Sequence, residues 1–457
     1  MRIQRLNEVS MKNLQEHLLK RNPSQYQEYE KTVFEILSHV KENGDEAILT
    51  YTEKFDGVKL NSDKLLVSEK EKFEAYEDVS KELLMVMRRA LINIREFHQK
   101  QKQNSWFDTN KNGGIVGQRV TSINRVGVYV PGGRATYPSS VLMNVVPAKI
   151  AGVKEIIMVT PPNKEGKIDS ATLVAAKEAG VDKIYKVGGA QGIGAMAYGT
   201  ETIPKVDKIV GPGNIYVALA KKAVYGLVSI DSIAGPSEIL ILADGEANPT
   251  YVAADLLSQA EHDELASSIL ITTCEKLADN VNKELERFLN QGVLLEPCNC
   301  SMDIQASGEC TCHESKCTTL SRREIIKKSL ENYGYIFIAK DMEQAIEAAN
   351  EIASEHLEIM TKNPFEVMTK IQNAGAIFLG DYSSEPLGDY FAGPNHVLPT
   401  NGTAKFFSPL SVDDFIKKTS IIAYSKEALK EVREDVEKFA HAEQLMAHAH
   451  AIKVRFE

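Results

Sequence analysis

Apolar positions follow two different patterns along the chain. Over the first hundred residues they recur at helical spacing, most clearly over 33–40 and 83–94, so this region predicts amphipathic helices. After Ile115 the pattern changes to short β-branched runs that alternate with helix-like stretches, joined by Gly or Pro. Such alternation is typical of parallel sheets covered by helices.

The alternation occurs in two series. The first series predicts strands at 126–130, 155–159, 183–187 and 208–210. The second predicts strands at 239–242, 268–272, 335–339, 357–360 and 376–379, with helices at 249–259, 275–289 and 342–353. A last amphipathic helix is expected from 426 to 454. The predicted fold class is therefore α/β, with two doubly wound parallel-sheet units and helical ends.

Composition and charge narrow the class of protein. The chain has 457 residues, of which 43% are hydrophobic and 25% charged, as in a soluble protein of two or three domains. A formal charge of −10 argues against a general binder of nucleic acids or anionic membranes. No apolar run approaches the ~18 residues of a membrane span, and the first residues lack the apolar core of a signal peptide. We expect a cytoplasmic enzyme.

Three glycine-rich junctions in the first series, at 129–134, 187–196 and 210–216, have the layout of phosphate-binding turns. Glycines let the backbone approach an anion, and the helix that follows presents unpaired N–H groups. Together the three junctions favour a nucleotide site, although each alone is equally explained as a tight turn. Gln191 and Asn214, at two helix starts, suit either a cofactor contact or a helix cap.

The second series carries most of the candidate chemistry. Gln259 and His262 are three residues apart on a predicted helix, so they share a face and could bind one ion together. The alternative is that both side chains are simply solvated at the end of the helix. Glu355 and His356 immediately precede a strand, where a carboxylate and an imidazole suit general acid/base work. An exposed polar turn is the alternative for that pair.

Further candidate ligands lie near the end of the chain. Asp389 and His396 fall in an irregular stretch over 387–402, and long irregular loops in compact enzymes are usually functional. Glu443 and His448 are five apart on the expected last helix, about 140° around it. With the Gln/His pair, Asp389 and His448 would make a mixed N/O site for Zn²⁺ or a similar ion. The residues alone predict a metal-assisted α/β enzyme that uses a nucleotide.

Nine ordered motifs between about Arg125 and Arg455 resemble the histidinol dehydrogenase family. They are RVGVYVPGG (125–133), GGAQ (188–191), GPGN (211–214), AGPSE (234–238), LSQAEHD (257–263), SEHL (354–357), LGDY (387–390), GPNHVLPTNG (393–402) and AEQLMAH (442–448). The resemblance implies that L-histidinol is oxidised to L-histidine by two NAD⁺ through a bound aldehyde, the last step of histidine biosynthesis.

The same resemblance assigns roles to the candidate residues. The zinc ligands would be Gln259, His262, Asp389 and His448, and the cofactor would contact Tyr129, Gln191 and Asn214. Ser237, His396 and Glu443 would complete a substrate site formed with the metal ligands and the catalytic pair. His356 would accept the alcohol proton, and Glu355 would activate water for attack on the aldehyde.

The resemblance also implies a domain plan and a homodimer. Two incomplete Rossmann-like domains would comprise 25–125 with 237–380, and 126–236, the second binding NAD. Residues 1–24 and 381–457 would be N- and C-terminal extensions. The dimer would be intertwined, with Glu443 and His448 reaching into the partner's site.

Several alternatives remain at this level. Five cysteines and His313 crowd into a segment about 296–319 that the family usually lacks: Cys298, Cys300, Cys310, Cys312 and Cys317. They suit a structural metal, redox-active thiols or a loop without a ligand. Cys274 ends an apolar strand and is interpreted as structural rather than nucleophilic. One rival function is oxidation of another small alcohol, such as a sulfonated diol. The other is a metal-dependent binding or regulatory protein that keeps the enzyme fold but has lost catalysis.

Overall fold

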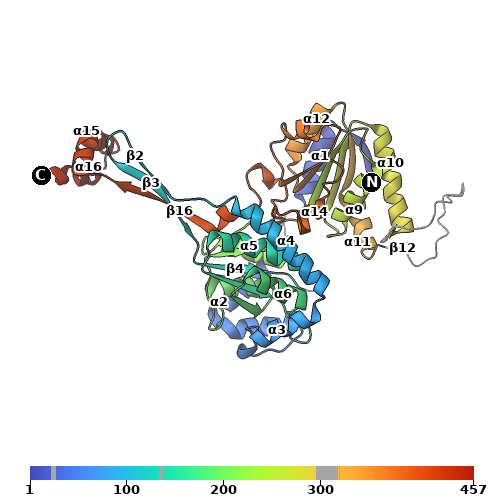
Figure 1. Cartoon of the computed structure of the whole chain (residues 1–457), viewed down its shortest axis with the longest axis horizontal. Coiled ribbons are helices and arrows are strands. Elements are labelled where there is room, and N and C mark those ends of the chain that lie inside the picture. Colours follow the sequence, from blue (N-terminus) through green and yellow to red (C-terminus); the bar gives the residue numbers. More distant parts are fainter. Residues whose placement is uncertain (22–26, 133–136, 295–316, 319) are drawn as a thin grey trace.

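Two α/β domains and a projecting arm make up the computed structural model of the chain (Figure 1). It describes residues 1–21, 27–132, 137–294, 317–318 and 320–457. The arm carries the C-terminus well away from both domains. None of the helices in the described ranges is long and apolar enough to cross a membrane.

One domain is built on a six-stranded parallel sheet in the order β1-β13-β10-β9-β14-β15. Its strands are β1 (Arg2–Arg5), β9 (Glu238–Ala243), β10 (Ser267–Thr272), β13 (Gly334–Ile338), β14 (His356–Met360) and β15 (Ala376–Leu379). Its helices are α1 (Glu8–Leu19), α9 (Pro249–Ala260), α10 (Glu275–Gln291), α11 (Arg323–Tyr333), α12 (Met342–Ile352), α13 (Pro364–Met368) and α14 (Glu385–Tyr390).

Helices cover both faces of this sheet, which explains why its strands are continuous apolar runs. Alternate residues of β9 point to opposite faces. Ile239 and Ile241 pack with α9, α10 and α11, whereas Leu240 and Leu242 pack with α1 and α12. A short antiparallel pair, β11 (Val293–Leu294) and β12 (Cys317–Thr318), flanks the Cys-containing segment.

The other domain has a five-stranded parallel sheet in the order β6-β5-β4-β7-β8. Its strands are β4 (Arg125–Tyr129), β5 (Glu155–Thr160), β6 (Lys183–Lys186), β7 (Lys208–Val210) and β8 (Ser229–Ile230). Its helices are α2 (Gln27–Asp56), α3 (Glu69–Asp78), α4 (Lys81–Gln99), α5 (Pro138–Ala151), α6 (Ser170–Ala179), α7 (Gly189–Tyr198) and α8 (Ile215–Val224), with a 3₁₀ turn η2 (Ser62–Lys64).

The arm contains elements that the sequence did not predict. An antiparallel sheet in the order β16-β3-β2 joins β2 (Trp106–Thr109), β3 (Ile115–Ser122) and β16 (Ile416–Ala423). Beyond it lie α15 (Lys426–Ala442), α16 (Met446–Lys453) and the 3₁₀ turn η5 (Val454–Phe456). Two further 3₁₀ turns, η3 (Thr403–Lys405) and η4 (Val412–Phe415), precede β16, and η4 packs on the core of the five-stranded domain. The single last helix expected over 426–454 is therefore wrong, because the chain breaks at Gln444, whose φ is +60°.

The α/β class and the predicted strands of both series are confirmed, but the grouping of the N-terminal segments is corrected. Residues 25–125 were expected with 237–380; instead α2, α3 and α4 pack on the five-stranded sheet. The expected extension over 1–24 contributes β1 to the edge of the six-stranded sheet as well as helix α1. An amphipathic pattern specifies that a helix covers a sheet but not which sheet, so sequence alone left this open.

Candidate functional site

A cleft of about 1240 Å³ is lined by residues of both domains. The five-stranded domain contributes the turn at 211–214 after β7. The six-stranded domain contributes most of the candidate chemistry: Ser237, His262, Glu355, His356, Asp389 and His396. The carboxyl ends of β4 and β7 face this cleft, as ligand sites in open parallel sheets usually do.

Glu355 and His356 are held by the backbone of one residue, Glu238, at the start of β9. His356 Nδ1 lies 2.9 Å from the carbonyl oxygen of Glu238, and the Glu238 N–H donates to Glu355 Oε2 at 2.8 Å. A carbonyl oxygen only accepts, so Nδ1 carries a proton, and in the neutral form of the ring the lone pair lies at Nε2. Both side chains are buried, which excludes the exposed polar turn considered for this pair.

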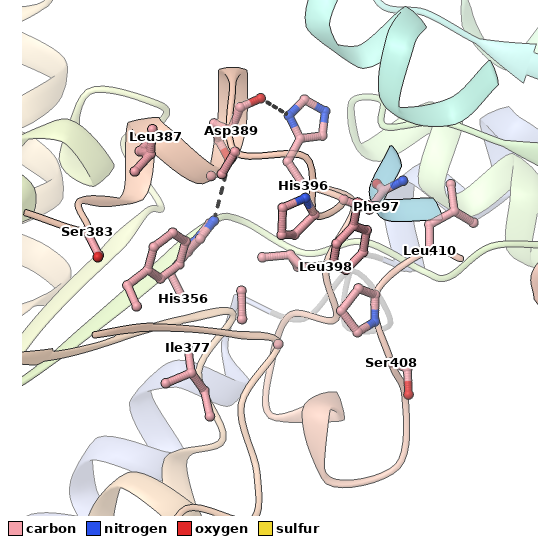
Figure 2. Close-up of a pocket in the computed structure, with 18 of the residues that line it drawn as sticks. Phe97, His356, Ile377, Ser383, Leu387, Asp389, His396, Leu398, Ser408 and Leu410 are labelled. Carbon is pink, nitrogen blue, oxygen red and sulfur yellow. Dashed lines mark hydrogen bonds and ion pairs between the residues drawn. The ribbon is translucent and has the colours of Figure 1, made fainter. Parts of the chain in front are cut away.

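Burial and neighbouring charge shift the ionisation of this pair. Burial raises the pKa of Glu355 to about 8. Burial alone would lower the pKa of His356, but the carboxylates of Glu355 and Asp389 outweigh it and raise that pKa to about 10. Figure 2 shows His356 facing Asp389, with Nε2 3.7 Å from Oδ1. A cation that took the Asp389 carboxylate would compete with the imidazolium and return His356 to its neutral form.

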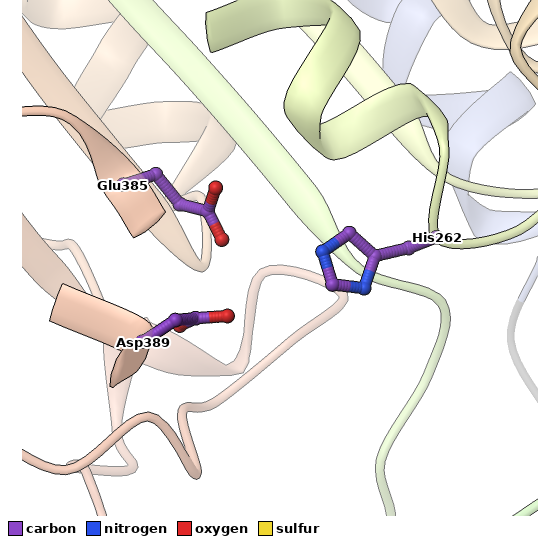
Figure 3. Close-up of side chains that lie close together, drawn as sticks. All are labelled: His262, Glu385 and Asp389. Atoms are coloured by element: carbon purple, nitrogen blue, oxygen red, sulfur yellow. The ribbon is translucent and has the colours of Figure 1, made fainter. Parts of the chain in front are cut away.

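A possible ion site lies beside this pair. His262, Glu385 and Asp389 each offer one ligand atom, and these atoms lie within 4.8 Å of one another (Figure 3). Burial lowers the pKa of His262, which favours the neutral imidazole that metals bind. The sequence analysis missed Glu385. The feature of the sequence that could have identified Glu385 is its position four residues before Asp389, which places both carboxylates on one face of α14.

Gln259 supplies an independent indication of a missing partner at this place. It lies in the last turn of α9, three residues before His262, which follows the end of the helix instead of sharing it. Gln259 is fully buried, yet neither its Nε2 nor its Oε1 has a hydrogen-bond partner among the described residues. Leaving a buried amide unpaired is costly, so such a group usually has a ligand, water or ion. The donor set of Gln259, His262 and Asp389 therefore fits a divalent cation such as Zn²⁺.

Three buried acids, Asp255, Glu358 and Glu385, lie around the possible ion site. Ser258 Oγ donates to Glu385 Oε2 at 2.9 Å, and the Glu385 N–H donates to Glu358 Oε1 at 2.8 Å. Burial raises the pKa of Glu385 to about 7 and that of Asp255 to about 6, and it raises the pKa of Glu358 well above its usual value. The sequence signal for these buried acids was the carboxyl group of Glu358 inside the largely apolar strand 356–360.

His396 and Ser237, the two substrate candidates of this chain outside the ion cluster and the catalytic pair, are both at the cleft. His396 is held by the backbone, with Nδ1 3.1 Å from the carbonyl oxygen of Asp389, and burial lowers its pKa. Both residues thus line the same cleft as the Glu355–His356 pair.

The three candidate cofactor residues are placed differently from one another. Asn214 lines the cleft, but its Oδ1 also caps α8 by accepting from the backbone N–H groups of Tyr216 and Val217 at 3.1 and 3.2 Å. Tyr129 and Gln191 are buried and are not among the cleft residues. The Tyr129 hydroxyl accepts from the Gly189 N–H at 3.1 Å, which braces the glycine-rich turn.

The turn after β7 requires glycine for structural reasons. Gly211 has φ +117°, and a Cβ there would lie 2.0 Å from the carbonyl oxygen of Tyr129. Lys221 donates to the Gly211 carbonyl at 2.9 Å and forms a buried ion pair with Asp231. The tight-turn explanation therefore holds at this position, while the turn still forms one wall of the cleft.

Glu443 and His448 are not brought to the site within this chain. Both are exposed on the arm (Figure 1). They are also not on one helix, because Glu443 caps α15 and His448 lies in α16. Any role at the cleft requires a second copy of the chain.

The cysteines give no candidate in the cleft. Cys298, Cys300, Cys310, Cys312 and His313 lie outside the described residues, and Cys317 is described only as part of β12. Cys274 packs against the core of the six-stranded domain and does not line the cleft. Its placement agrees with a structural thiol.

Comparisons with known proteins agree along nearly the whole chain. A family model described as histidinol dehydrogenase matches residues 19–304 and 311–456, a gap that falls inside the expected Cys-containing insertion. Histidinol dehydrogenase of Clostridium acetobutylicum is 53% identical over 427 residues, covering 93% of this chain and 92% of the relative. That of Aquifex aeolicus is 53% identical over 441 residues, covering 96% and 95%.

A solved structure gives the same result. The crystal structure of histidinol dehydrogenase from Elizabethkingia anophelis has a TM-score of 0.87 and 37% identity, covering 100% of this chain and 98% of that one. The family match and the high identity over most of both lengths leave one conclusion. The chain belongs to the histidinol dehydrogenase family.

Proposed function

We propose that the cleft oxidises L-histidinol to L-histidine in two successive steps, each of which reduces one NAD⁺. Membership of the family makes the chain an NAD-dependent oxidoreductase. The observation that supports the site best is the buried Glu355–His356 pair, fixed by one residue and facing the His262–Asp389 cluster.

We assign the metal to Gln259, His262 and Asp389, with the partner subunit's His448 as the fourth ligand. Bound there, Zn²⁺ would fix the amino and imidazole nitrogens of the substrate. The unpaired Gln259 amide and the neutral His262 imidazole support this set. Glu385, held by Ser258, would keep Asp389 in place behind the ion.

The two oxidations use different groups of the pair. In the first, His356 Nε2 accepts the hydroxyl proton while the alcohol carbon loses hydride to nicotinamide, giving the aldehyde, one NADH and one proton. In the second, Glu355 accepts a proton from the water that attacks the aldehyde carbon. The hydrated aldehyde then loses hydride to a second NAD⁺, giving the carboxylate, a second NADH and two protons, of which Glu355 takes the first and solvent receives the other. Tyr129, Gln191 and Asn214 are assigned to the cofactor, and Ser237 and His396 to the substrate.

We also propose an intertwined homodimer in which the partner subunit's Glu443 and the partner subunit's His448 complete the site. The arm also exposes large apolar side chains, including Ile422 (75%) and Phe439 (74%), which a monomer would leave in water. A second, largely apolar cavity of about 710 Å³ is also lined by His356, Asp389 and His396 (Figure 2).

The expected stoichiometry is two NADH formed for each L-histidinol consumed. Both values can be measured on one sample, NADH by absorbance and histidinol with histidine by chromatography. A single NADH per substrate, with an aldehyde as product, would contradict the four-electron assignment. Turnover of a sulfonated diol but not of L-histidinol would contradict the substrate assignment and favour the rival alcohol.

Removal of the metal should abolish turnover and lower thermal stability together. A ligand that binds only the folded state adds about 2.7 kcal/mol at a hundred times its Kd. We therefore expect the stripped protein to melt several degrees lower and to recover with Zn²⁺. Gln259→Leu, which keeps the side chain's approximate size, should weaken this Zn²⁺-dependent increase in Tm. Full activity and an unchanged Tm without metal would contradict the site.

A further inference from the structure

A buried ion pair joins the N-terminal segment to the catalytic pair. Arg21 follows α1 and is only 1% exposed. Its guanidinium pairs with the Glu238 carboxylate, and its second nitrogen donates to the Leu265 carbonyl at 2.8 Å. The Tyr333 ring lies against the guanidinium, 5.2 Å from ring centroid to Cζ. The cation is therefore held on several sides.

Glu238 is the residue whose peptide groups hold both members of the catalytic pair. Its N–H donates to Glu355 Oε2, and its carbonyl oxygen accepts from His356 Nδ1. β9 is also the direct neighbour of β14, with His356 opposite Ile239 in the register. A small displacement at the start of β9 would therefore move the hydrogen-bonding partners of Glu355 and His356 at the same time.

Stability alone does not account for this pair. Removing two charges from water costs about as much as their attraction returns, so a buried ion pair is a weak source of stability. What it does give is a fixed position, because a buried carboxylate with one cationic partner has few alternative arrangements. The Glu238 side chain and backbone are thereby held together directly beside Glu355 and His356.

We infer that Arg21 is a positioning residue for the oxidation: by holding Glu238 it orients His356 and Glu355. The inference rests on the proposed function of that pair. Arg21 also borders the cleft, but its guanidinium is bound to Glu238 and to the Leu265 carbonyl, so it acts through Glu238 rather than on the reacting atoms. It should therefore affect the chemical steps and leave substrate and metal binding largely intact.

The experiment is a double-mutant cycle on the purified full-length, zinc-loaded enzyme. Arg21→Met, Glu238→Gln and the double variant are compared with wild type for kcat and KM, with L-histidinol and with the aldehyde. We expect Arg21→Met to lower kcat in both steps by about tenfold to a hundredfold, the range for a small misplacement of catalytic groups. KM and zinc content should stay within about twofold of wild type.

The cycle also tests the route of the effect. If Arg21 acts through Glu238, the double variant should be no slower than the slower single variant, because both changes break the same link. Multiplied losses in kcat would show that Arg21 acts elsewhere. A loss confined to KM would show direct ligand binding by Arg21. Either result, or a wild-type kcat in Arg21→Met, overturns the inference.

Arg5→Met is the matched control. Arg5 lies in the same N-terminal segment and pairs with Glu275 at 2.6 Å, but both side chains are well exposed, at 78% and 65%. We expect it to leave kcat unchanged. If Arg21→Met does not fold, the isosteric Glu238→Gln and the charge-preserving Arg21→Lys are compared instead. We then expect a higher kcat for Arg21→Lys than for Glu238→Gln. An inactive wild type would instead contradict the proposed function.

Discussion

Glu355→Gln should stop the reaction after one oxidation. We expect the alcohol step to keep its rate within about threefold and the aldehyde step to fall by about 10²- to 10⁴-fold, the usual contribution of a general base. The amide oxygen can still accept from the Glu238 N–H, so the side chain should stay in place. What it loses is the ability to take a proton from water. The yield should fall from two NADH per L-histidinol towards one.

The reciprocal variant, His356→Asn, separates the two roles. Asn can still donate to the Glu238 carbonyl oxygen in place of Nδ1, but it has no group at the position of Nε2. It should slow alcohol oxidation and affect oxidation of added aldehyde much less. Single-turnover NADH formation with each substrate measures both steps. Equal losses on the two substrates in both variants would refute the division of labour.

Glu264→Gln is the control for this pair of variants. Glu264 lies two residues after His262 but pairs with Lys328 at 2.8 Å on the exposed side of the domain. It loses the same charge as Glu355→Gln without touching the cleft residues. We expect both steps at the wild-type rate. A comparable loss there would mean that overall charge, rather than the Glu355 proton acceptor, controls the aldehyde step.

The sequence predicted those parts of the molecule whose signal is local. β9 and β14 are short, fully buried strands in which apolar residues predominate, so they were found within one or two residues. The strands of the arm were missed because β2 and β16 are largely exposed and show no alternation. An arm that is not packed on the core of its own chain lacks the buried face that strand prediction relies on.

In the candidate site, too, residues with a local sequence signal could be predicted and residues that depend on distant contacts could not. Glu355, His356, His262 and Asp389 could be singled out because their residue types and local positions suggest chemistry. Arg21 and Glu238 could not. Arg21 is one of 53 lysines and arginines, and its role depends on a contact across 217 residues of sequence. Glu238 contributes through its peptide groups, which every residue possesses.

A heterodimer of two inactive variants should regain about half of the wild-type activity. The subunits would carry His356→Asn and His448→Ala, with different tags for isolation of the mixed dimer. In an isologous dimer with exchanged arms, one of its two sites combines an intact cleft with an intact arm, and the other holds both defects. His448 is exposed on the arm, and β16 pairs with β3 over eight residues, so the arm is held away from its own cleft.

The control is a heterodimer of His356→Asn and Asp389→Asn. It should stay inactive, because both substitutions affect cleft residues and each of the two sites keeps one of them. If the mixed His356→Asn and His448→Ala dimer also stayed inactive, His448 would have to act within its own chain or outside the site.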